Sequence, residues 1–125
     1  MKTLGIPALM TLMLVSAITP LAAHHSWPIT YDKLVTVKGK VVDFKWANPH
    51  PMMTLEVQAN DGKTEKWLVG GPAIIRMEAN GWTKTTVKPG DTITGIGYQF
   101  ADGEKVLRLE RVVLPDGKEL RLYGK

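Results

Sequence analysis

The side chains best suited to chemistry in this sequence are its three histidines. His24 and His25 are adjacent, and His50 lies between two prolines in the segment Asn48-Pro49-His50-Pro51-Met52. Imidazole is a common transition-metal ligand, and imidazole with a thioether such as that of Met52 is a soft donor set that favours copper, particularly Cu(I). We therefore predict a copper site formed by His24, His25, His50 and Met52.

The start of the chain determines where the first two histidines stand. Residues 1–23 have a positive charge at Lys2, an uncharged apolar stretch and small residues at the end, as in a cleaved signal peptide. We therefore expect a soluble periplasmic or secreted bacterial protein with no membrane span after cleavage. Cleavage after Ala23 would let the α-amine and imidazole of His24 chelate one ion. Cleavage after Ala22 would make His25 the third residue and create a square-planar nitrogen site for Cu(II) or Ni(II).

A simpler interpretation of each feature stays open. Two polar residues can stand on a frayed terminus without a role, Asn-Pro-His-Pro is also a turn sequence, and methionine often fills gaps in a core. The two groups of histidines can share a metal only if the N-terminal arm, residues 24–33, folds back over up to about 33 Å. Trp27-Pro28 and Tyr31 are the residues that could hold the arm against the rest of the protein.

Composition excludes several classes of function. The chain has 125 residues, no cysteine and a formal charge of +4, which leaves room for one small domain without disulfides, thiol nucleophiles or thiolate metal sites. No run of Lys or Arg is present, so we expect no nucleic-acid partner. Because no carboxylate pair, phosphate-binding glycine loop or H-E-x-x-H segment is present, we expect the protein not to be an enzyme.

The elements that must position the histidines are short strands between turn signals. We expect strands over residues 35–46, 53–58, 65–69, 92–100 and 106–114, a short helix over residues 73–79 and a terminal hairpin turning at residues 115–117. The first strand changes its apolar phase near Gly39, which predicts a bend there. In the helix Ile74 and Met77 should face the core, with Ile75 as a third candidate, and Trp82 should anchor the core.

This order of elements predicts an all-β fold, a small five-stranded OB-fold-like Greek-key barrel with one short helix between strands 3 and 4. The barrel should occupy residues 34–125, after the signal peptide and the arm. A barrel has few free edges, which suits a small domain without disulfides. A small β-sandwich is the second possibility.

In an OB-fold the loop that contains His50 and the loop near Asp102 flank the usual ligand face. This position supports a second functional hypothesis. The protein could be an accessory module that docks on an exported partner protein, or could bind a small organic ligand. The face used would contain Trp27, Trp46, Asn48 and Trp67.

Five short motifs occur together: A-H-H-S (Ala23 to Ser26), W-x-N-P-H (Trp46 to His50), G-W (Gly81-Trp82), K-P-G-D (Lys88 to Asp91) and L-P-D-G (Leu114 to Gly117). With them the mature chain resembles an uncharacterised family of small exported bacterial proteins, chiefly proteobacterial. The resemblance implies that the histidines and the Asn-Pro-His segment occupy the family's characteristic positions. It implies no reaction. Met52 stands where the family commonly has an aromatic residue.

Overall fold

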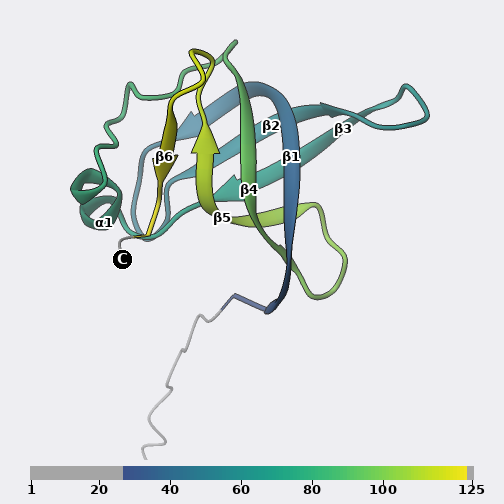
Figure 1. Ribbon diagram of the computed structural model, residues 1–125, viewed down its shortest axis with the longest axis horizontal. Helices are drawn as coiled ribbons and strands as arrows, with labels where there is room; N and C mark the ends of the chain where they lie inside the picture. The colour runs from purple at the N-terminus through teal and green to yellow at the C-terminus, as the bar shows by residue number, and fades with distance from the viewer. Residues whose placement is uncertain (1–26, 124–125) are drawn as a thin grey trace, which may run out of the picture.

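The computed structural model describes residues 27–123 (Figure 1). Six strands and one helix follow one another along this part of the chain: β1 (Ile29–Lys45), β2 (Met52–Gln58), β3 (Thr64–Gly70), α1 (Ile74–Ala79), β4 (Thr92–Phe100), β5 (Val106–Val113) and β6 (Glu119–Arg121). The predicted signal peptide and the first two histidines lie outside the described residues. Between residues 27 and 123, no helix has the length and apolar character needed to cross a membrane.

The strands form one sheet that closes on itself. Its order is β3-β2-β1-β4-β5-β6 with antiparallel neighbours, and a parallel pairing of β3 with β5, from Leu68 opposite Val106 to Gly70 opposite Arg108, closes the barrel. The order and the place of α1 between β3 and β4 confirm the predicted OB-fold-like barrel. Strand β6 is the second arm of the expected terminal hairpin and pairs with the end of β5.

Strand β1 is long enough to serve two neighbours because it bends. It pairs with β4 up to Lys40 and with β2 from Lys40 onward, with a bulge between Val41 and Asp43. A Cβ at position 39 would lie 2.6 Å from the carbonyl oxygen of Glu56, so only glycine allows the two backbones to approach this closely. Figure 1 shows β1 arching over the barrel. The bend predicted near Gly39 is therefore present.

Strand β1 begins earlier than the sequence predicts. The sequence places residues 29–33 in an arm, yet Ile29 pairs with Phe100 of β4. The ring of Tyr31 packs edge-on against that of Tyr98, with 5.0 Å between centroids. Residues 30–33 lack the alternating apolar pattern of a strand, so only contacts with the distant strand β4 reveal that they belong to the sheet.

The core lies inside the barrel and under α1. Trp82 is buried as predicted, with only 1% of its surface exposed, and its indole Nε1 donates a hydrogen bond to the carbonyl of Arg121 over 2.9 Å. Met77 is buried too, but Ile75 is 76% exposed, so the expectation that Ile75 faces the core is wrong. Six residues give too short a helix to bury more than one narrow stripe. The buried apolar residues are Val37, Val41, Met53, Leu55, Val69, Met77, Trp82, Val87, Ile93, Leu107, Leu109, Val112 and Leu122.

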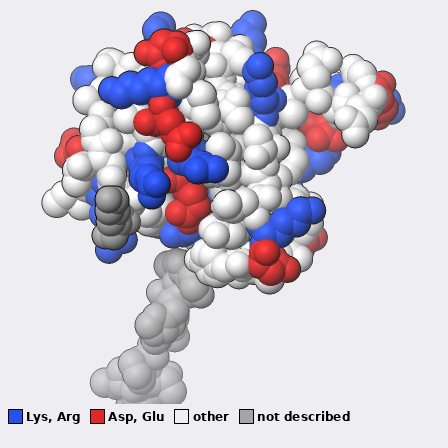
Figure 2. Space-filling model, viewed as in Figure 1, with Lys and Arg blue, Asp and Glu red and all other residues white. Residues whose placement is uncertain are grey.

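Charges of both signs are mixed on the face formed by β4, β5 and β6. Figure 2 shows blue and red side chains side by side on this face. Arg108 pairs with Glu110, and Arg111 lies 3.7 Å from Glu119. This alternation agrees with an ordinary solvated surface for the face shown.

Tyr123 supplies a prediction for alkaline pH. Burial raises the pKa of its hydroxyl above the ordinary value of 10.0, and Arg108, whose guanidinium carbon lies 3.7 Å from the ring centroid, partly offsets the shift. A raised pKa means that the folded state holds the proton more tightly than the unfolded state, so protonation of Tyr123 favours folding. This contribution to stability is complete below about pH 10 and is lost as the pH rises above that value. We expect urea unfolding at about pH 9 and pH 11 to show a smaller loss of stability for Tyr123→Phe than for the wild type. An equal loss of stability in the two proteins would contradict a raised pKa for Tyr123.

Candidate functional site

His50 is held in one orientation by a backbone carbonyl. It lies half-buried in the loop between β1 and β2, and its Nδ1 atom is 3.1 Å from the carbonyl oxygen of Gly71. A carbonyl oxygen only accepts hydrogen bonds, so we assign the proton to Nδ1, which leaves the lone pair on Nε2. Histidines that bind metals use this arrangement, in which a carbonyl orients the ring and the other nitrogen is the ligand.

Asn48 anchors the same loop to α1. Its side-chain Oδ1 accepts a hydrogen bond of 3.2 Å from the backbone N–H of Ile74, at the start of the helix. The helix needs this partner because the side chain at its N-cap position, Ala73, makes no capping hydrogen bond. Asn48, which is expected on a ligand or partner face, is exposed and uses its Oδ1 atom to cap α1. Asn48 and His50 together fasten the Asn-Pro-His segment to residues 71–74.

The two adjacent methionines point to opposite sides of β2. Met53 is buried in the core, with 1% of its surface exposed. Met52 is partly exposed and pairs with Gly70 of β3. The sulfur of Met52 occupies the place where a Cβ on residue 70 would be. The thioether of Met52 fits there because Gly70 has no side chain. The next residue, Gly71, is the one whose carbonyl contacts His50.

Trp27 brings the beginning of the described chain to His50. The centroids of the indole and imidazole rings are 4.6 Å apart in an edge-on arrangement, and the indole also lies 5.7 Å from the ring of Phe100. The carbonyl of Pro28 accepts a 2.7 Å hydrogen bond from the backbone N–H of Ala101. The segment that leads into β1 therefore lies between the β1–β2 loop and the β4–β5 loop. Sequence periodicity carries no sign of this contact.

Within residues 27–123, no group of three or more His, Cys, Asp or Glu side chains lies close enough to hold a metal. His50 is the one histidine in this range. A metal site at His50 with three ligands would therefore need donors of another kind, such as the Met52 thioether, or donors from outside residues 27–123.

Trp46 and Trp67, the other two tryptophans proposed for a ligand or partner face, have different surroundings. Trp46 packs edge-on against Phe44 at 5.8 Å. The indole Nε1 of Trp67 donates to Glu65 over 3.3 Å, and Lys105 pairs with the same carboxylate at 3.0 Å. Hydrogen bonds from Lys105 and Trp67 lower the pKa of the Glu65 carboxyl. Trp67 also lines a groove between β1 and the β2–β3 hairpin.

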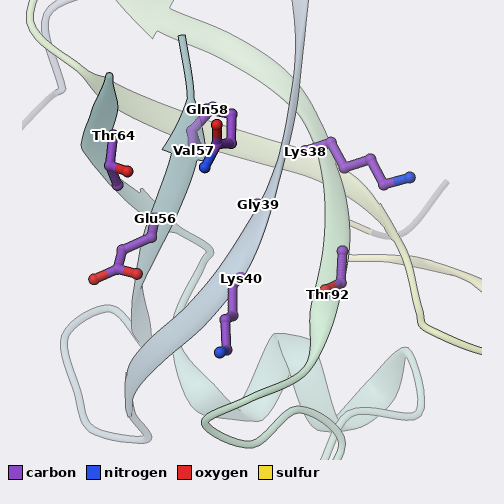
Figure 3. Close-up of a pocket in the computed structure, with 8 residues that line it drawn as sticks. All are labelled: Lys38, Gly39, Lys40, Glu56, Val57, Gln58, Thr64 and Thr92. Carbon is purple, nitrogen blue, oxygen red and sulfur yellow. The ribbon is translucent and has the colours of Figure 1, made fainter. Parts of the chain in front are cut away.

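A shallow pocket of about 380 Å³ lies where β1 and β2 diverge, with Gly39 among its lining residues (Figure 3). The long side chains of Lys38, Lys40 and Glu56 point in different directions there. None of the site residues predicted from the sequence lines this pocket, and its charged groups do not converge on one point. The one sign of this pocket in the sequence is Gly39, the glycine at the bend of β1.

The closed strand order and the inter-strand helix place the protein among small OB-fold-like barrels. The yeast (S. cerevisiae) mitochondrial single-stranded DNA binding protein Rim1 has a similar fold, with a TM-score of 0.50 and 12% identity over 66% of this chain and 92% of that one. Two structures of TiaS, one in complex with a tRNA and ATP and one with agmatine, match at TM-scores of 0.47 and 0.45 and identities of 10% and 13%. They cover 66% and 74% of this chain, which spans only 18% and 24% of those chains.

At 12% identity, the similarity to Rim1 shows a shared fold alone. The chain itself belongs to the family of unknown function DUF6152, whose family model matches residues 11–107. No curated protein sequence matches it.

Proposed function

We propose that this protein is an exported, non-enzymatic metal-binding protein of the periplasm that captures copper through His24, His25 and His50. The observation that carries the proposal is the contact of Trp27 with His50. Only one residue, Ser26, lies between His25 and Trp27, so their Cα atoms are at most about 7 Å apart. The imidazole of His25 is therefore within reach of His50, which is the condition for a shared site.

The orientation of His50 adds chemical support. The hydrogen bond from Nδ1 to the Gly71 carbonyl favours the tautomer whose Nε2 atom can bind a metal. Packing by Trp27 and the two flanking prolines leaves the ring little conformational freedom to lose on binding. With nitrogen donors from the N-terminal residues, the set suits Cu(II) in a tetragonal geometry.

The test is a titration of the mature protein with Cu(II). The protein is purified from the periplasm, its intact mass fixes the cleaved bond, and affinity is measured by competition with a chelator of known affinity. We expect one Cu(II) per chain for the wild type. His50→Ala should weaken binding by at least about tenfold, since even the loss of a residue that only supports a ligand costs that much.

The control is a triple variant with His24, His25 and His50 replaced by alanine, checked for folding by circular dichroism. Quenching of Trp27 fluorescence by paramagnetic Cu(II) locates the ion, because Trp27→Phe should remove most of the quenching. Equal Cu(II) affinity in the wild type and the triple variant would refute the proposed function.

A further inference from the structure

The thioether of Met52, two residues after His50 in the sequence, is a soft donor that the proposed Cu(II) site does not require. Met52 opens β2, two residues after His50, and its sulfur rests on Gly70. His50 makes its hydrogen bond to Gly71, the next residue. The imidazole and the thioether therefore contact two adjacent residues, Gly71 and Gly70.

The segment Gly70-Gly71 is itself held in place. The backbone N–H of Gly71 donates a hydrogen bond of 3.2 Å to the carbonyl of Pro51. Pro51 lies between His50 and Met52, so this bond joins the His50-Met52 segment to the Gly70-Gly71 segment. A side chain at position 70 would collide with the sulfur of Met52. The backbone therefore fixes the neighbourhood of both donors before any ion arrives, which lowers the entropy lost on binding.

The surroundings of these donors suit a monovalent soft ion. Thioether and imidazole ligands select Cu(I) among the common metal ions of cells. The indole of Trp27 lies edge-on to the imidazole of His50, with 4.6 Å between the ring centroids. Electron-rich indole faces also attract cations.

We infer that His50 and Met52, beside Trp27, form a Cu(I) site that shares His50 with the proposed Cu(II) site but does not use His24 or His25. The inference rests on the proposed function for the choice of copper. It adds that the protein accepts both oxidation states through two different donor sets.

The test compares two affinities in the same variants. Cu(I) affinity is measured anaerobically, with the Cu(I)–bicinchoninate complex as the competitor, and Cu(II) affinity as described above. Met52→Leu keeps the volume of the side chain, so folding should be retained, and we expect Cu(I) affinity to fall at least about tenfold while Cu(II) affinity changes less than about twofold. Met53→Leu is the matched control, and both affinities should remain at the wild-type level.

The paired variant His24→Ala/His25→Ala should show the opposite pattern, with Cu(II) binding lost and Cu(I) binding retained. Gly70→Ala should displace the thioether and weaken Cu(I) binding in the same way as Met52→Leu. X-ray absorption of the Cu(I) form adds an independent readout, in which the wild type should show a sulfur ligand that Met52→Leu lacks.

The outcomes separate the two proposals. Unchanged Cu(I) affinity in Met52→Leu, or no sulfur ligand in the wild type, overturns the Cu(I) site even where Cu(II) capture stands. Loss of Cu(I) affinity in Met52→Leu with no Cu(II) binding by the wild type supports the Cu(I) site and refutes the proposed function.

Discussion

Replacing Trp82 by alanine should cost the protein about 3–5 kcal/mol of folding free energy, a large part of the about 5–15 kcal/mol that holds a typical domain together. The indole is 1% exposed and belongs to the same core cluster as Met77 and Leu122. Its Nε1 also ties the segment after α1 to the carbonyl of Arg121. The substitution therefore opens a cavity and leaves that carbonyl without its partner.

Urea unfolding followed by the fluorescence of the remaining tryptophans measures this loss. Trp46→Ala is the matched control, because Trp46 is only partly buried at the edge of the core and should cost clearly less. Trp82→Phe keeps much of the volume but removes the donor, so its cost should lie between those of the other two variants. Equal midpoints for Trp82→Ala and Trp46→Ala would show that Trp82 does not anchor the core.

Gly97→Ala is expected to be the other severe substitution. Strands β4 and β5 pair closely around a bulge between Ile96 and Gly97. A Cβ at position 97 would overlap the carbonyl of Arg108 and lie 2.9 Å from the Cα of Leu109. Since the obstacle is backbone, relief requires the strands to separate, at a cost of about 3 kcal/mol.

The control for Gly97→Ala is Thr92→Ala on the same strand. Thr92 is exposed, so this change should alter stability by no more than about 0.5 kcal/mol. Amide hydrogen exchange gives a local readout, and protection along β4 and β5 should fall in Gly97→Ala alone. Wild-type protection in that variant would mean that the two strands tolerate a side chain at their closest approach.

Much of the fold is predictable because its signals are local. Asn60 to Lys63 and Lys88 to Asp91 are turn sequences, and alternating residues mark the strands that follow them. Gly39 indicates the bend of β1 for a physical reason that the structure confirms, the close approach of β2. The same local signals place helix α1 between β3 and β4, which distinguishes this barrel from a sandwich.

The arrangement around His50 is predictable only in part. The sequence draws attention to the Asn-Pro-His segment, but the partners that give each residue its role are more than twenty positions away. Asn48 contacts Ile74, His50 contacts Gly71, and Trp27 reaches His50 only because β1 curves round the barrel. Propensity and periodicity carry no information about such contacts. The early start of β1 escapes sequence reasoning for the same reason.

The return of Trp27 to His50 also affects how this protein could be cross-linked. Its chain has no cysteine, so no disulfide can brace it. In the copper-bound state that we propose, an ion held by His25 and His50 would close a loop of about 26 residues, which by the chain-entropy relation for cross-links is worth about 3.5 kcal/mol. Copper would then take the place of a disulfide, as a cross-link that forms when the ion binds and is removed by a chelator.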